Sequence, residues 1–253
     1  FQQEISLHGD QIHNYPPQQF THLPILPVRN DAGEWIKIAI ELHGRTVYAK
    51  VWELQVGRIS LYLLDTDIPE NSSEDRGLTH QLYGGNNEHR LKQEILLGIG
   101  GTRLLKALGI SVDIYHCNEG HAAFLNLERL RDYMQAHRMS YEQAIELVRA
   151  SSLFTTHTPV PAGHDYLSED LLRSYLQDYI TEMGVSWERF IALGKVDPNN
   201  SHELFSMSHL AIRMSQEVNG VSKLHGLVSQ RMFNVLYSGF APKELHIGYV
   251  TNS

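Results

Sequence analysis

The chain alternates short runs of strand-forming residues with longer helical patterns, and this alternation limits its fold more than any other feature. In the second half, strand candidates are Val112 to Cys117, Leu153 to His157 and His246 to Thr251. Apolar residues at helical spacing separate them, as in the stretches 119–137, 141–150 and 219–236, and Ser168 is placed to cap a further helix. Strands joined by helices pair in parallel through right-handed crossovers. The sequence therefore predicts an α/β fold with a Rossmann-like parallel sheet flanked by helices.

The first part of the chain follows a different pattern. Residues 1–34 are irregular and interrupted by prolines, and three β-rich stretches then follow at Trp35 to Leu42, Thr46 to Val56 and Ile59 to Leu64. Breaks this short are typical of an antiparallel meander. We therefore expect residues 1–68 to form an irregular segment and a β-meander packed on the main domain. Residues 69–253 are expected to form the α/β lobe.

Charge and cysteine content exclude several classes of protein. The net charge is −8, with 29 acidic and 21 basic residues, and no cluster of Lys and Arg stands out. Nucleic acid and anionic membrane surfaces are therefore not expected as partners. No apolar run approaches the roughly 20 residues of a membrane-spanning helix. A single cysteine, Cys117, allows no internal disulfide and fits a reducing cytoplasm.

A glycine-rich stretch at Leu97 to Gly101 has two interpretations. Backbone amides of glycine-rich loops bind phosphates where a strand turns into a helix. Here the glycines lie inside a helical pattern that starts near Asn87, so the strand is missing. The sequence favours close packing of helices over phosphate binding.

Two strand candidates end in histidine-containing polar segments. Asn118 is placed to cap the helix expected from Glu119 onwards, and Glu119 would complement the helix dipole, but neither role explains His121. At the other strand end, His157 and Thr158 precede a loop with two prolines. Sugar hydroxyls both donate and accept hydrogen bonds, so such side chains suit a polyhydroxylated ligand. A loop histidine without a binding role remains the alternative for His157.

A metal site is a second alternative for the same side chains. His116, Glu119, His121 and His157 would converge if neighbouring strands end side by side, and imidazole with carboxylate suits zinc. Their spacing is not the His-Glu-X-X-His of helical zinc sites. No metal ligand is therefore assigned from the sequence.

The sequence resembles the α-glucan phosphorylases, which act on glycogen, starch or maltodextrin, and in particular a bacterial branch of that family. The resemblance lies in five stretches in the family's order: RLKQEILLGIGG (Arg90 to Gly101), YHCNEGHAAFLNLERLR (Tyr115 to Arg131), TTHTPVPAGHD (Thr155 to Asp165), VNGVSKLHG (Val218 to Gly226) and YVTNS (Tyr249 to Ser253). It implies the N-terminal lobe of a glycosyltransferase-B fold. The start without methionine and the end just after a strand-like run are expected of a piece of a longer protein, with the cofactor-binding C-terminal lobe outside this chain.

The resemblance also implies an activity for the intact enzyme. Members of the family remove glucose from the end of an α-1,4-glucan with inorganic phosphate and release glucose 1-phosphate with retention. Their pyridoxal phosphate, bound to a lysine that would lie beyond this chain, relays a proton through its 5′-phosphate. We expect no pyridoxal phosphate on this chain, no activity from it alone, and glucan, phosphate and the C-terminal lobe as partners. A homodimer of the intact enzyme remains open.

Individual site residues follow from the resemblance. His157 matches the histidine that binds the hydroxymethyl end of the cleaved glucose, and Thr158 follows as in the family, although Thr156 stands where many members have Asn. This histidine is the expected catalytic residue, and Thr158 is an expected substrate-binding residue.

A second segment matches the Asn-Asp-Thr-His stretch that lines the glucan cleft. It carries Asn118, Glu119 and His121, with Glu119 in place of Asp and Gly120 in place of Thr. We expect these three polar residues to bind substrate. The loop at 84–87 lies where the family has a mobile gate. A non-catalytic carbohydrate-binding domain on the same scaffold, or a His/Glu metal hydrolase, remain as alternative functions.

Overall fold

The computed structural model describes residues 2–16, 18–81 and 85–252. Contacts divide the chain into two compact units, residues 1–40 with 46–93 and residues 41–45 with 94–253. The first unit continues past residue 68 as far as Gln93, and the assignment of 1–68 and 69–253 as separate domains stays a prediction. The expected gate loop at 84–87 includes Gly84, which lies outside the described residues.

The first unit is built on an antiparallel sheet. Its strands are β3 (Ile25–Pro27), β4 (Lys37–Leu42), β5 (Arg45–Val56) and β6 (Ile59–Asp65). The long strand β5 pairs with all three others, so the predicted meander is confirmed and β3 is added to it. A hairpin of β1 (Gln2–Ile5) and β2 (Gln11–Asn14) precedes this sheet, and the short helix α1 (Ser73–Arg76) follows it.

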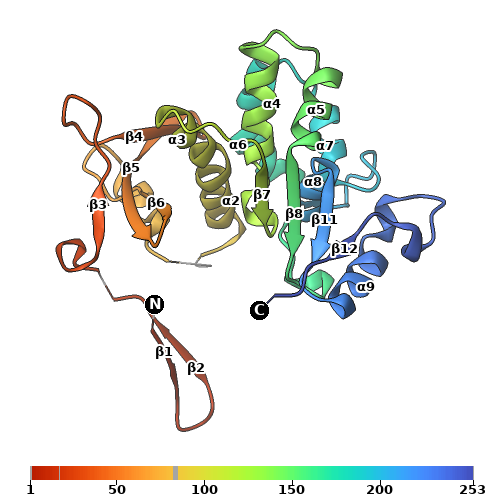
Figure 1. The fold of residues 1–253 in the computed structure, drawn as a ribbon, viewed down its shortest axis with the longest axis horizontal. Coiled ribbons are helices and arrows are strands. Elements are labelled where there is room, and N and C mark those ends of the chain that lie inside the picture. Colours follow the sequence, from red (N-terminus) through yellow and green to blue (C-terminus); the bar gives the residue numbers. More distant parts are fainter. Residues whose placement is uncertain (1, 17, 82–84, 253) are drawn as a thin grey trace. The chain divides into compact units, whose positions relative to one another are not determined.

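The second unit is built on a parallel sheet, as the sequence predicted. The strand order is β12-β11-β8-β7, and all neighbours are parallel (Figure 1). The strands are β7 (Tyr115–Asn118), β8 (Ser152–Thr156), β11 (Glu217–Gly220) and β12 (Gly248–Tyr249). A short antiparallel pair, β9 (Tyr166–Leu167) and β10 (Phe205–Ser206), lies apart from this sheet.

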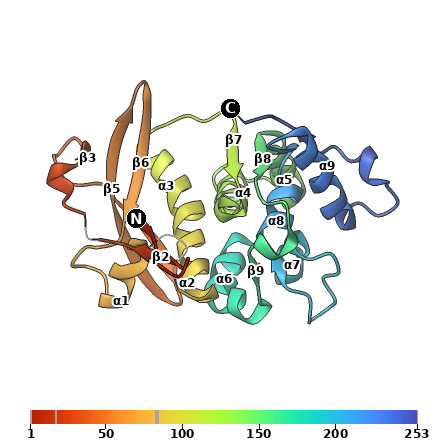
Figure 2. The same ribbon diagram turned by 90° about the horizontal axis from the view of Figure 1, so that it is seen from below.

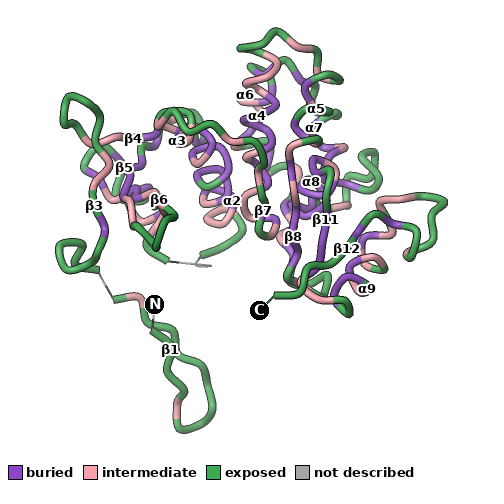
Figure 3. Tube along the Cα trace, viewed as in Figure 1, coloured by how far each residue is buried: buried purple, intermediate pink, exposed green. Residues whose placement is uncertain are grey.

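Helices connect and flank the parallel strands. They are α4 (Leu125–Gln135), α5 (Tyr141–Ala150), α6 (Glu169–Met183), α7 (Trp187–Gly194), α8 (Met207–Arg213) and α9 (Lys223–Met232). Helix α7 packs against both α6 and α8 (Figure 2). Buried stretches run through α4, β8 and β11, where Phe154 and Leu127 are fully enclosed (Figure 3). The predicted mixed α/β architecture is therefore confirmed.

Helix starts follow the capping residues closely. Ser140 and Gln143 form a capping box at α5, and the Ser168 hydroxyl accepts a hydrogen bond from the Leu171 amide at α6, as predicted for that segment. The predicted helix from Asn219 to Leu236 is wrong at its start. Residues 219–220 belong to β11 because they pair with β8 and β12, and α9 begins only after Ser222 caps it.

The glycine-rich stretch lies within one continuous helical segment. Helix α2 (Asn87–Ile95) continues through a π-helical stretch, η3 (Leu96–Gly100), into α3 (Gly101–Ala107). A Cβ atom on Gly98 would lie 2.7 Å from the Leu125 backbone nitrogen and 2.8 Å from the Phe124 Cβ. The close helix packing favoured from the sequence is therefore confirmed, and helix α2, rather than a strand, leads directly into these glycines.

Among the described ranges, no helix combines the length and apolar character needed to cross a membrane.

The contact at Gly98 gives a prediction about stability. Gly98→Ala should lower the free energy of unfolding by about 1–3 kcal/mol, because the methyl group meets backbone atoms of α4. Gly101→Ala is the matched control: a Cβ there has open space, and alanine favours helix over glycine by up to about 1 kcal/mol. Urea unfolding of both variants measures the difference. Equal stabilities would contradict the packing described for Gly98.

Candidate functional site

Polar side chains tie together three neighbouring strands where they end. Thr155 of β8 lies opposite Asn118 of β7 and Asn219 of β11. The Thr155 hydroxyl donates to Asn219 Oδ1 at 3.0 Å and lies 2.7 Å from His116 Nε2. Because this hydroxyl has one hydrogen, it accepts from His116, which makes Nε2 the protonated nitrogen. Burial, and then the nearby charge of His157, lower the pKa of His116, so this ring is neutral at physiological pH.

The residue after β7 has an unusual backbone conformation. Glu119 has φ 64° and ψ 176°, a region that glycine adopts easily and other residues adopt at a cost of about 1–3 kcal/mol. Its backbone N–H still donates to the Thr155 carbonyl at 2.9 Å. The chain then enters a 3-10 turn, η4 (Gly120–Ala122).

This turn overturns the predicted helix cap. Asn118 is the last residue of β7, and α4 begins six residues after Glu119, at Leu125. The position before α4 is Phe124, which makes no side-chain capping bond. The positive φ of Glu119 redirects the chain, so a helix cannot start directly after the strand.

The Glu119 carboxylate holds the segment that follows β8. Its Oε1 accepts hydrogen bonds from the His157 backbone N–H and from the Thr158 hydroxyl, the latter at 3.0 Å. The His157 side chain itself is exposed. The structure therefore brings together Glu119, His157 and Thr158, which the sequence had placed in two separate segments.

The loop from His157 to Asp165 is compact. It contains the 3-10 turn η5 (Pro161–Gly163), and a Cβ on Gly163 would lie 2.6 Å from Thr158 Cγ2. Near the end of the loop, the buried His164 ring bonds Ser208 Oγ through Nδ1 at 2.8 Å. The loop is thus held at its start by Glu119 and near its end by α8.

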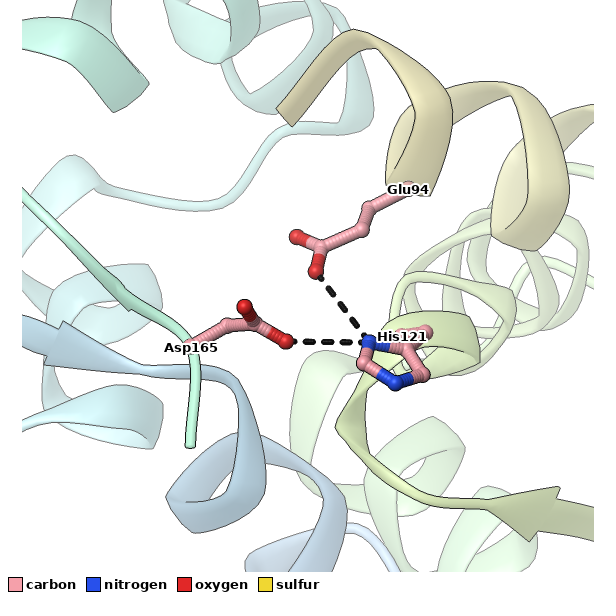
Figure 4. A group of neighbouring side chains, drawn as sticks. All are labelled: Glu94, His121 and Asp165. Atoms are coloured by element: carbon pink, nitrogen blue, oxygen red, sulfur yellow. Dashed lines mark ion pairs between the residues drawn. The ribbon is translucent and has the colours of Figure 1, made fainter. Parts of the chain in front are cut away.

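A second cluster lies at the far end of this loop. His121 of η4 has Nδ1 2.9 Å from Asp165 Oδ2 and 3.7 Å from Glu94 Oε1, and its Nε2 points away from both carboxylates (Figure 4). The His121 side chain is 30% exposed, whereas those of Asp165 and Glu94 are 15% and 5% exposed. Asp165 first, and Glu94 next, raise the pKa of His121 to about 9. The ring is therefore an imidazolium at neutral pH.

This cluster differs from the metal ligands considered from the sequence. Within residues 2–16, 18–81 and 85–252, the group with metal-ligand geometry is Glu94, His121 and Asp165, whose ligand atoms lie within 4.8 Å of one another. His116 and His157 are not part of it. The sequence reasoning missed Glu94 and Asp165 as site residues, although both lie inside the quoted stretches RLKQE and PAGHD.

Comparison with known proteins shows which proteins this chain is similar to. The model of the carbohydrate phosphorylases matches residues 103–252, more than half of the chain. A glycogen phosphorylase of Mycobacterium tuberculosis is 40% identical over 264 residues, covering 100% of this chain and 30% of the relative. A maltodextrin phosphorylase of Thermococcus litoralis is 41% identical over 252 residues, covering 100% of this chain and 29% of the relative. The chain therefore spans about 30% of the length of these relatives.

The pKa of His121 predicts how stability depends on pH. The pKa of His121 rises from 6.5 to about 9 on folding. Its contribution to the free energy of unfolding is therefore fully present below about pH 6.5 and is lost as pH rises through 9. The loss attributable to His121 should be on the order of 2 kcal/mol, allowing for partial solvent exposure. Denaturant unfolding at pH 6 and pH 9.5 measures it.

His121→Gln should reduce this pH dependence, because glutamine does not titrate. His202→Gln, a change at an exposed loop histidine of the same unit, is the control and should keep the full dependence. If the His121 variant and the wild-type protein lost the same free energy between the two pH values, the ion pairs would not hold a proton on this ring.

Proposed function

The chain belongs to the carbohydrate phosphorylase family, and we propose that it supplies the glucan-binding wall of an enzyme that cleaves α-1,4-glucans with inorganic phosphate. The chain spans about 30% of the relatives' length, so the proposal assigns the activity to the whole protein. The observation that carries it is the bonding of Glu119 to both His157 and Thr158, which gathers the two segments of the strand edge.

The chemistry of this edge suits sugar hydroxyls. Asn118, His157 and Thr158 are exposed or half-buried side chains that donate or accept hydrogen bonds without a fixed charge when histidine is neutral. In the proposal, His157 bonds the hydroxymethyl group of the terminal glucose, and Asn118, Thr158, Glu119 and His121 line the path of the glucan. Binding that is stronger in the transition state than in the ground state would raise kcat.

The phosphate is expected to bind elsewhere. Two carboxylates, Glu94 and Asp165, lie within 4.8 Å of the one imidazolium of the second cluster, so this cluster carries a net negative charge. Like charges repel, and phosphate needs cationic partners as charge develops at the anomeric carbon. We assign phosphate binding to the C-terminal lobe of the whole protein.

Pyridoxal phosphate is also assigned to that lobe, where its 5′-phosphate would supply the proton relay of the reaction. The lysine with the least exposed side chain here, Lys195, does not fit a Schiff base. Its Nζ donates to Glu169 Oε2 at 2.8 Å and to the Asn200 carbonyl at 3.2 Å. Both bonds occupy the amine, whereas Schiff-base formation needs an amine that can attack an aldehyde.

The proposal extends to the setting of the whole protein. We place it in the cytoplasm, since Cys117 is buried and unpaired and a reducing compartment keeps such a thiol free. The C-terminal lobe is its expected partner, and a homodimer remains open.

The proposal predicts that the isolated chain is inactive. Without the phosphate-binding cations, the 253-residue chain should form no glucose 1-phosphate from maltoheptaose and phosphate, whereas the whole protein should form it. Coupled detection of glucose 1-phosphate measures both. Turnover by the isolated chain would contradict the assignment of phosphate binding to the C-terminal lobe.

Two other outcomes would favour different functions. A whole protein that binds maltoheptaose without phosphorolysis would be a carbohydrate-binding protein. One equivalent of zinc in the purified protein, lost on His121→Ala, would favour a metal hydrolase, because His121 belongs to the group with metal-ligand geometry.

His157→Ala tests the proposed sugar contact in the whole protein. The loss of one hydrogen bond to the reacting glucose should lower kcat/KM for glucan by about 10- to 100-fold. The melting temperature should stay unchanged, because the His157 side chain is exposed. His202→Ala, at another exposed histidine, should leave both quantities unchanged. Wild-type kcat/KM in the His157 variant would remove this residue from the site.

A further inference from the structure

We propose that Glu119 is a positioning residue: its carboxylate fixes the His157 segment, and the strained backbone of Glu119 is what places the carboxylate there. The inference rests on the proposed function for its effect on catalysis, but not for the contacts themselves. It gives Glu119, which the proposed function places along the glucan path, a second role that needs no direct contact with the glucan.

The hydrogen-bond pattern of β7 and β8 shows what the carboxylate replaces. Tyr115 N–H donates to the Ser151 carbonyl, and Glu119 N–H donates to the Thr155 carbonyl. In a parallel ladder with this register, the next donor is the His157 N–H and its acceptor would be the main-chain carbonyl of Glu119. The His157 N–H instead donates to the side-chain Oε1 of Glu119. Where the ladder ends, the Glu119 carboxylate thus replaces the main-chain carbonyl as the acceptor of the His157 N–H.

The same oxygen also fixes the next residue. Thr158 Oγ1 donates to Glu119 Oε1 at 3.0 Å, while the Thr158 N–H donates to Thr156 Oγ1 at 3.3 Å. Backbone and side chain of the His157–Thr158 segment are therefore both held. The exposed His157 ring projects from a backbone whose position Glu119 determines.

The strained backbone conformation occurs at a glutamate, although glycine would be the more stable residue there. At φ 64° and ψ 176°, glycine is the residue with the lowest conformational cost. Exchanging Glu119 with the neighbouring Gly120 would relieve the turn only by crowding α8. A Cβ at position 120 would lie 3.1 Å from Met207 Cβ and 3.3 Å from the Ser208 nitrogen. A glutamate at 119 therefore costs backbone energy, and its compensating gain is the pair of hydrogen bonds.

Three variants of the whole protein separate strain from positioning. Glu119→Gly removes the carboxylate and the strain, Glu119→Ala removes the carboxylate and keeps the strain, and Glu119→Gln keeps an acceptor oxygen. The measurements are the melting temperature, hydrogen exchange of the peptide 154–160 by mass spectrometry, and kcat and KM for maltoheptaose.

We expect exchange in this peptide to accelerate about tenfold in both the glycine and the alanine variants, because the His157 amide loses its acceptor. Both should lose about 10- to 100-fold in kcat with little change in KM, since glucan contacts beyond His157 remain. The glycine variant should melt at a higher temperature than the alanine variant. Glu119→Gln should keep most of the protection and of kcat.

Two results would overturn the proposal. Wild-type exchange of the peptide 154–160 in the glycine variant would show that the carboxylate does not hold the segment. A kcat that follows the melting temperature across the three variants would reduce Glu119 to a stabilising contact. If the wild-type protein forms no glucose 1-phosphate, the proposed function fails, but the exchange experiment still decides whether Glu119 holds the His157 segment.

Discussion

The parallel pairing of β7, β8 and β11 is the constraint on which the candidate site depends. It sets Asn118, Thr155 and Asn219 side by side, so that every segment leaving these strands starts from the same edge of the sheet. The pairing is enforced by burial: Cys117 and Phe154 are fully enclosed and Val218 is 4% exposed. A shift of register by one residue would turn these side chains to the other face. Core packing thus fixes the positions of polar residues that contribute little to the core.

The loop from His157 to Asp165 joins two electrostatically different clusters. At its start, Glu119 accepts hydrogen bonds from neutral donors and positions the exposed His157. At its end, Asp165 pairs with the imidazolium of His121, which also faces Glu94. Since His121 lies only two residues after Glu119, the turn η4 and this loop hold each other at both ends. Attachment at both ends limits the conformations open to the side chains between them, and side chains ordered before a ligand arrives lower the entropy cost of binding.

The sequence predicted the architecture well where local signals were strong. The alternation of strands and helices, the meander of β4 to β6 and the capping serine of α6 were all sufficient to predict the elements they mark. Asn219 and Gly220 were included in the helix predicted for 219–236, but their pairing with β8 and β12 makes them part of a strand. The spacing of apolar residues along a short segment does not predict pairing between strands that are far apart in the sequence.

The sequence predicted only part of the site, because the rest depends on contacts between residues far apart in the chain. The sequence identified the polar strand ends, but it assigned Asn118 to a helix cap. The residues around Glu119 give no signal that its φ is positive. Glu94 and Asp165 join His121 through tertiary structure alone, from α2 and from the loop before β9. Their presence in the family-like stretches was the available signal.

We propose that the strand edge of this chain binds the terminal glucose of an α-glucan through His157. A crystal structure of the whole protein with bound maltoheptaose tests this contact. We expect a glucose hydroxymethyl oxygen about 2.7–3.2 Å from a His157 ring nitrogen, with the Glu119 carboxylate still bonded to the His157 amide. A terminal glucose bound away from the ends of β7 and β8, with His157 facing solvent, would contradict it.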